Sequence, residues 1–141
     1  MHWNTITVGI DDTLASKRAL RRAADLAIAA KARLVVTSVA PVLTGTAASK
    51  GIGPFDPADP PEAHERELRN ASDSLAVRGV EAELYLGVGE PAATIVAVAD
   101  KYDSDLIVVG RRRHSFLHRL FGSSVSRAVA RKAHCDVLIV G

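Results

Sequence analysis

The sequence predicts an α/β protein with a doubly wound, five-stranded parallel sheet, strand order 3-2-1-4-5, and helices on both faces. Four short runs are rich in β-branched residues and apolar throughout, which is typical of strands buried on both faces of a parallel sheet. Stretches with helical periodicity separate these runs. Since the chain has 141 residues, 48% of them hydrophobic, we expect one domain over residues 1–141 with its own core.

Five segments are expected to be strands. The four apolar runs are TITVGI (5–10), RLVVTSV (33–39), DLIVVG (105–110) and DVLIV (136–140). A fifth run, VEAELYLG (80–87), alternates between apolar and polar residues, which predicts a strand near the sheet edge. Its residues Val80, Ala82, Leu84 and Leu86 are expected to face one way. A small chain with five strands favours the order 3-2-1-4-5.

Four helices are expected between these strands, over residues 13–31, 59–78, 91–102 and 123–133. The second has clear end signals, because Asp59 can cap it, Pro60 suits a first turn and Gly79 can stop it. Residues 41–61 hold five prolines and three glycines, which predicts a long flexible loop.

The charge distribution favours a small anion as partner. The net charge is only +2, which argues against general affinity for nucleic acid. Residues 110–135 contain seven Lys or Arg and no Asp or Glu, so this segment carries +7 and the remainder −5. A local basic block on a nearly neutral protein suits a small anion better than a duplex.

Several function classes are not supported. No run approaches the roughly 20 apolar residues of a membrane span, and residues 1–10 lack a signal-peptide pattern, so we expect a cytoplasmic protein with no membrane partner. The lone Cys135 excludes an intramolecular disulfide. His114 and His118 are four residues apart but have no third ligand, so we expect no metal site of the protein itself.

The expected topology places a ligand site beyond the carboxyl ends of the strands. In a doubly wound sheet the site lies where the winding reverses, here between the first and fourth strands. That rule brings together Asp11, the end of the second strand near Val39, and the loop after Gly110. The dinucleotide, P-loop and nucleophile-elbow motifs are all missing, and no nucleophile–base pair can be assembled, so we expect no catalytic residues.

Four fragments, in order and over nearly the whole chain, resemble the universal stress protein family. VGIDDTLASKRALRRAADLA (8–27) is similar to its first strand and helix, with Asp11 at the acidic position. SVAP (38–41) is similar to the end of its second strand. The family's strand–Gly-x-Pro–helix–strand signature is similar to GVGEPAATIVAVADKYDSDLIVVG (87–110). Its last helix and strand resemble SSVSRAVARKAHCDVLIV (123–140). The resemblance implies a stress-response regulatory protein that binds an adenine nucleotide, with at most weak ATP hydrolysis.

The family's nucleotide-binding members carry a G-x2-G-x9-G-[ST] loop before the last helix. This sequence keeps the spacing but places Gly110, Arg113, Ser123 and Ser124 at the four positions. The nucleotide-binding residues that the resemblance implies are Asp11, Val39, Val109, Gly110, Arg113, Ser123, Ser124 and Val125. The implied ligand is ATP or another adenine nucleotide, with Mg²⁺ only if ATP binds.

The altered loop leaves two interpretations open. Glycine permits a positive φ and lets backbone N–H groups approach phosphate, and a left-handed Arg or Ser costs roughly 1–2 kcal/mol. Against this, Arg111–Arg113 can form charge-assisted bonds to phosphate, and Ser123 and Ser124 can cap a helix that faces an anion. The chain is therefore either a nucleotide binder with a degenerate loop or a dimeric interaction module of the same fold without nucleotide. A third interpretation, a small adenylating or flavin-associated enzyme, would need a metal or a catalytic carboxylate beyond Asp11, and the sequence does not show one.

Individual residues also have structural interpretations. Asp11 can contact ribose or a phosphate-bound metal, or it can cap the first helix with Asp12 and Thr13. Val39 can offer backbone groups to adenine and still be the last buried residue of its strand. Arg111–Arg113 can clamp an anion or lie in a solvated, salt-bridged loop. The resemblance implies a homodimer through residues 136–140, an apolar edge that would otherwise stay unpaired, and unidentified regulatory protein partners.

Overall fold

Five parallel strands form one sheet in the order β3-β2-β1-β4-β5, in a computed structural model that describes residues 2–42, 54–111 and 124–141. The strands are β1 (Thr5–Ile10), β2 (Arg33–Ala40), β3 (Ala82–Val88), β4 (Leu106–Gly110) and β5 (Asp136–Val140). Every neighbouring pair is parallel. The predicted fold class and strand order are confirmed.

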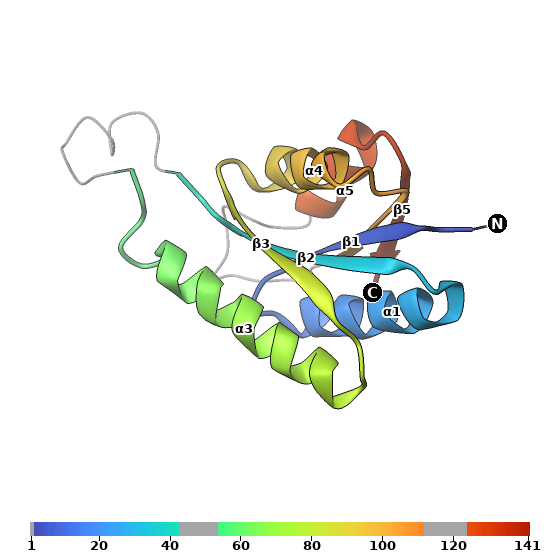
Figure 1. Ribbon diagram of the computed structural model, residues 1–141. Coiled ribbons are helices and arrows are strands. Elements are labelled where there is room, and N and C mark those ends of the chain that lie inside the picture. The colour runs from blue at the N-terminus through green and yellow to red at the C-terminus, as the bar shows by residue number, and fades with distance from the viewer. Residues whose placement is uncertain (1, 43–53, 112–123) are drawn as a thin grey trace.

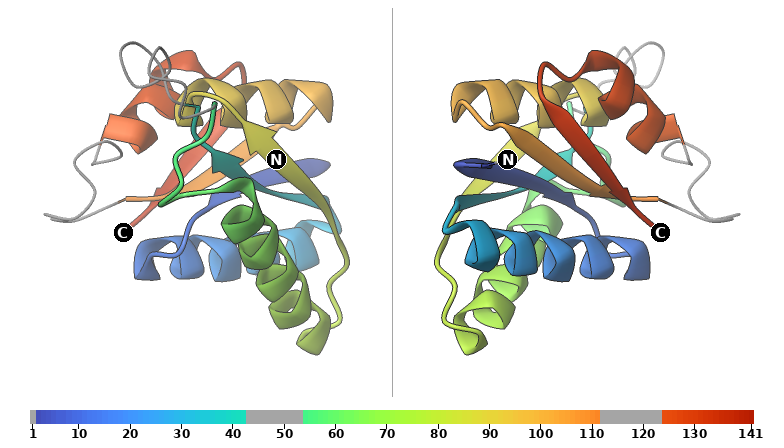
Figure 2. Two further views of the ribbon diagram at one scale, coloured as in Figure 1. Left: turned by 90° about the vertical axis from the view of Figure 1, so that its left-hand side faces the viewer. Right: turned by 90° about the vertical axis from the view of Figure 1, so that its right-hand side faces the viewer.

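Helices cover both faces of the sheet. They are α1 (Leu14–Ala30), α3 (Pro61–Val77), α4 (Pro91–Lys101) and α5 (Ser124–Lys132). In Figure 1, α1 and α3 lie below the sheet and α4 and α5 above it, and the two side views of Figure 2 show the same layering. The chain therefore changes face after β3, which is the doubly wound arrangement that the sequence predicts.

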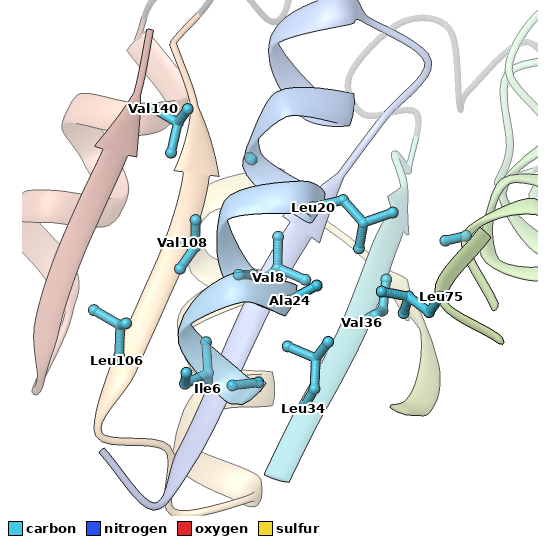
Figure 3. Close-up of a cluster of buried hydrophobic side chains, with 14 of the residues drawn as sticks. Ile6, Val8, Leu20, Ala24, Leu34, Val36, Leu75, Leu106, Val108 and Val140 are labelled. Carbon is cyan, nitrogen blue, oxygen red and sulfur yellow. The ribbon is translucent and has the colours of Figure 1, made fainter. Parts of the chain in front are cut away.

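Alternate residues of the buried strands fill two apolar layers. Ile6, Val8, Leu34 and Val36 pack toward α1 and α3, where Leu75 joins them (Figure 3). On the other face, Val39, Ile107 and Val109 pack against residues of α4 and α5. Each fully buried Val, Leu or Ile side chain contributes roughly 1.5–3 kcal/mol. Because both faces of β1, β2 and β4 are covered, their sequences read as continuous apolar runs. The same burial was predicted for β5 and is wrong, because β5 is an edge strand with Ile139 38% exposed.

The structure corrects the predicted start of the second helix. The N-cap position of α3 is Pro60, which makes no side-chain capping bond, and the helix begins at Pro61. Asp59 instead places Oδ1 2.7 Å from Nε2 of His64. The predicted stop is confirmed, because the helix ends at Val77 and Gly79 has a φ of +73°.

The structure also modifies the expectations for the third strand and for the predicted long loop. β3 begins at Ala82, two residues after the predicted start. Val80, Ala82 and Leu86 pack against the α1/α3 layer as predicted, whereas Leu84 remains 38% exposed because β3 is an edge strand. Within the predicted 41–61 loop, Val42 and Phe55 form an isolated antiparallel bridge.

Candidate functional site

The carboxyl ends of β1 and β4 meet at the point where the sheet reverses its winding. β1 is central and pairs with β2 on one side and with β4 on the other, with Ile10 opposite Ser38 and Val8 opposite Val108. β1 leads into α1 on one face, whereas the chain after β4 leads to α5 on the opposite face. Asp11 and Gly110 therefore flank the switch point, as the sequence predicts.

Asp11 organises the start of α1. Its Oδ1 accepts hydrogen bonds from the backbone N–H of Thr13 at 2.9 Å and from the Thr13 hydroxyl at 2.6 Å. Its own backbone N–H donates to Ser16 Oγ at 2.8 Å. Thr13 is the N-cap of α1, since its Oγ1 accepts from the Ser16 N–H. Asp11 thus supports the cap and presents a half-buried carboxylate at the carboxyl edge of the sheet.

Gly110 is packed against the backbone of α1. A Cβ at this position would lie 2.7 Å from the carbonyl carbon and oxygen of Ala15 and 2.9 Å from the Ser16 nitrogen. Real Cβ atoms do not approach backbone this closely, so a side chain here would force the end of β4 and the start of α1 to shift. The first glycine of the loop pattern therefore has a packing reason in addition to any contact with phosphate.

Three other predicted site residues belong to the apolar layer beneath α4 and α5. Val39 is 9% exposed and Val109 3%, and the half-buried Val125 in the first turn of α5 packs against the same cluster. Ser124 is the first residue of α5. Arg113 and Ser123 lie outside the described residues, as do His114 and His118.

Two basic side chains lie at the end of β5. Arg18 Nε donates to the carbonyl oxygen of Gly141 at 3.1 Å. The backbone N–H of Arg111 donates to the Val140 carbonyl at 2.7 Å, and its guanidinium lies beside Gly141. The sequence predicts a contact with an anion for Arg111, whereas Arg18 is expected on a solvated helix face, because only the parallel β4–β5 register brings the end of β5 beside α1.

A buried polar network lies next to the site and was not predicted. Ser38 Oγ lies 2.7 Å from His64 Nδ1 and 2.8 Å from Glu67 Oε2. The pKa of Glu67 is raised, mainly because the carboxyl is buried and to a smaller extent because Asp12 and Asp11 lie nearby; the Ser38 hydrogen bond and His64 act in the opposite direction. The electrostatic effect of Asp11 and Asp12 connects this network to the turn between β1 and α1.

Ser38, His64 and Asp59 are the residue types of a hydrolytic triad, but their geometry does not suit catalysis. A nucleophilic serine must be open to substrate and must give its proton to histidine. Ser38 is 0% exposed, so its hydroxyl is not open to substrate, and the same hydroxyl also lies 2.8 Å from Glu67 Oε2. We therefore treat the network as part of the core.

Two further observations bear on cofactors and membranes. Among the described residues, no group of three or more His, Cys, Asp or Glu side chains is arranged to hold a metal ion. In the same part of the chain, no helix combines the length and apolar character needed to cross a membrane.

Comparison with known sequences identifies relatives. A family profile described as "Universal stress protein family" matches residues 2–141. Universal stress protein YxiE of Bacillus subtilis is 42% identical over 73 residues, which cover 52% of this chain and 49% of YxiE. The chain spans about half the length of YxiE and of two further curated universal stress proteins that it matches.

Two solved structures resemble the chain over almost its full length. A universal stress protein in complex with cAMP is 32% identical, with a TM-score of 0.71, over 99% of this chain and 98% of the other. The universal stress protein from Archaeoglobus fulgidus in complex with dAMP is 28% identical, with a TM-score of 0.73, over the whole of both chains.

Proposed function

This chain belongs to the universal stress protein family, and from that premise we propose that it binds an adenine nucleotide at the carboxyl edge of its sheet. The observation that carries the proposal is the meeting of Asp11 and Gly110 at the β1–β4 switch point. Support comes from two relatives of the same fold whose structures hold cAMP and dAMP.

In the proposed complex, different parts of the edge hold different parts of the nucleotide. Val39, Val109 and Val125 line the adenine site, where backbone groups of Val39 face the polar edge of the base while the Val39 and Val109 side chains stay buried in the core. Asp11 contacts the ribose hydroxyls, or Mg²⁺ when the ligand is ATP. Gly110, Arg113, Ser123 and Ser124 surround the phosphate, next to the first turn of α5, where backbone N–H groups favour an anion.

Basic side chains replace the missing glycines of the phosphate loop in this proposal. Arg111 and Arg18 both lie beside Gly141 at the end of β5, and Arg112 and Arg113 follow Arg111 in the sequence. A charge-assisted bond to phosphate is roughly twice as strong as a neutral one. The proposed activity is binding, with at most weak hydrolysis of ATP, and we assign no catalytic residue.

We also propose a homodimer through β5 that acts on regulatory partners in the cytoplasm. Among the residues that the structure describes, β5 pairs with β4 alone and is an edge strand of the sheet. Val137 and Leu138 are half-buried, and Ile139 is 38% exposed. Pairing with a second β5 would cover this apolar edge. A dimer without nucleotide is the second candidate, favoured by the loss of glycine at positions 113 and 123.

Substitution of Asp11 tests the proposed site, with the same substitution of Asp12 as a matched control. Asp11→Asn keeps an Oδ1 that accepts from Thr13, so α1 retains its cap, but removes the charge and one oxygen acceptor. We expect at least tenfold weaker nucleotide binding in equilibrium titrations. Asp12→Asn removes the same charge from the adjacent, exposed residue and should change affinity less than twofold. Equal affinities for both variants and the wild type would mean that Asp11 does not contact the nucleotide, so the nucleotide would bind elsewhere or not at all.

A further inference from the structure

A buried polar network fastens the start of α3 to the carboxyl end of β2. Ser38 belongs to β2, His64 and Glu67 to the first two turns of α3, and Asp59 to the segment before that helix. His64 is the central group, with Nδ1 2.7 Å from Ser38 Oγ and Nε2 2.7 Å from Asp59 Oδ1. Ser38 is 0% and His64 5% exposed. These bonds therefore replace hydration for polar groups that solvent hardly reaches.

The three hydrogen bonds fix the number of protons that the network needs. A hydroxyl has one hydrogen, and an ionised carboxylate only accepts. With Glu67 and Asp59 ionised, Ser38 donates to Glu67 and His64 must donate from both ring nitrogens. With Glu67 protonated, its O–H donates to Ser38, the Ser38 hydroxyl donates to Nδ1, and Nε2–H donates to Asp59. Both arrangements hold the same number of protons and differ only in which residue, His64 or Glu67, carries one of them.

From this balance we propose that Ser38, His64, Glu67 and Asp59 form a proton-sharing switch. One proton is held between His64 and Glu67 through the Ser38 hydroxyl, keeps the start of α3 fastened to β2, and is released as the pH rises. After its release two hydrogens remain for three bonds, so one bond breaks. Glu67 then stays ionised beside a neutral imidazole, which a half-buried carboxylate tolerates poorly.

The charges around the network determine the direction of the pH effect. Asp11 and Asp12 face Glu67 from the β1–α1 turn, Asp59 faces His64 from the segment before α3, and β2 contributes only the neutral Ser38. Burial, reinforced by Asp11 and Asp12, raises the pKa of Glu67 above its usual 4.5. A raised pKa means that the fold favours the protonated group. Its contribution to stability is therefore fully present below pH 4.5 and is lost as the pH rises through the raised pKa.

The switch would act beside the proposed nucleotide site without depending on it. Ser38 directly precedes Val39, and Glu67 lies within electrostatic reach of Asp11. Loss of the shared proton would loosen the first turns of α3 and the residues just before it, whereas the β1, β2 and β4 strands would keep their pairing. Both the presence and the pH range of this loosening can be measured on the protein without any ligand.

The test is an NMR titration of the whole chain with the ring nitrogens of His64 and the carboxyl carbon of Glu67 labelled. In the wild type we expect both signals to report one common step, because a shared proton titrates as a property of the pair. In Glu67→Gln the His64 signal should no longer follow that wild-type step, because the carboxylate that shares the proton is removed. Glu65→Gln, an exposed change on the same helix, should leave the step in place. Separate midpoints in the wild type, or an unchanged His64 midpoint in Glu67→Gln, would overturn the proposal.

A second variant keeps the proposal testable if Glu67→Gln does not fold. Ser38→Ala removes only the bridging hydroxyl, so His64 and Glu67 should titrate with separate midpoints. Amide exchange supplies a structural readout: in the wild type, the first half of α3 should lose protection relative to α1 as the pH rises through the common midpoint. A common midpoint that survives in Ser38→Ala, or α3 protection that follows α1 at every pH, would contradict a proton shared through Ser38.

Discussion

Gly110 lies so close to Ala15 that a Cβ on the glycine would be 2.7 Å from the carbonyl carbon and oxygen of the helix residue. Ala15 is in the first turn of α1, directly after the Asp11–Thr13 cap. The contact therefore holds the end of β4 against the start of α1 and keeps the two sides of the switch point together. A glycine that belongs to a phosphate-loop pattern is also a structural requirement of the sheet–helix packing.

This contact predicts a clear difference between two glycine substitutions. Gly110→Ala should destabilise the protein by about 3 kcal/mol, because the new methyl group meets helix backbone that cannot rotate away. Gly9→Ala adds the same methyl group against the tip of the Ile95 side chain, at 2.8 Å, and should cost about 1 kcal/mol, because a side chain can adjust. Urea unfolding of both variants measures the difference. Equal losses would mean that Gly110 has no special packing role.

The proposed β5 interface predicts which sheet edge controls assembly. Ile139→Lys should convert the dimer to a monomer, because a charged ammonium would be buried in the interface. Leu84→Lys is a matched control, since Leu84 is also 38% exposed but lies on β3 at the opposite edge. Light scattering of both variants gives the molar masses. A dimer that survives Ile139→Lys, or dissociates in Leu84→Lys, would place the interface elsewhere.

The arginine-rich loop predicts a loss of affinity that net charge alone does not explain. Replacing Arg111, Arg112 and Arg113 together by Ala should weaken nucleotide binding at least tenfold, because the bonds to phosphate that we propose for these side chains would be lost. Replacing the exposed Arg21, Arg22 and Arg69 by Ala removes the same charge away from the loop and should change affinity less than threefold. The titrations are compared at one ionic strength, since distant charges are screened by salt. Similar losses in both triple variants would indicate general electrostatic attraction instead of a phosphate site.

Cys135 is predicted to react slowly with thiol reagents. Burial raises the pKa of its thiol above the usual 9.0, and Asp100, Asp136 and Asp105 raise it further. Since the thiolate is the nucleophile, the folded protein at pH 8 should react with a disulfide reagent at least tenfold more slowly than the urea-unfolded chain. A pH series of rates should show the increase displaced to higher pH on folding. Equal rates at pH 8 in the two states would contradict this environment.

Most of the fold could be predicted from the sequence because its signals are local. The β-branched runs of β1, β2 and β4 are buried on both faces, and β1, β2, β4 and β5 all lie within one residue of their expected bounds. Gly79 ends α3 as expected, because its φ of +73° suits glycine. The predicted start of the same helix was wrong, because the Asp59 carboxylate bonds the His64 ring across one turn instead of capping the backbone. Which of these two groups Asp59 bonds depends on how α3 packs.

The candidate site was less predictable because its contacts are tertiary. Asp11 and Gly110 could be placed by the switch-point rule alone. The close approach of Gly110 to Ala15, and the link of Ser38 to α3, depend on how α1 and α3 sit on the sheet. One signal was available: His64 lies in register with Leu68, Ala71 and Leu75 on the buried face of α3. A histidine on an apolar helix face needs polar partners, and the sequence does not say which they are.

The central claim, that this chain binds an adenine nucleotide, is tested most directly by calorimetric titration of nucleotide-stripped protein with cAMP, AMP and ATP, each with and without Mg²⁺. We expect a micromolar dissociation constant for at least one of these nucleotides, a matching rise in melting temperature, and an effect of Mg²⁺ only with ATP. No heat at millimolar concentration of any of the three, together with an unchanged melting temperature, would contradict the central claim and favour the interaction module without nucleotide.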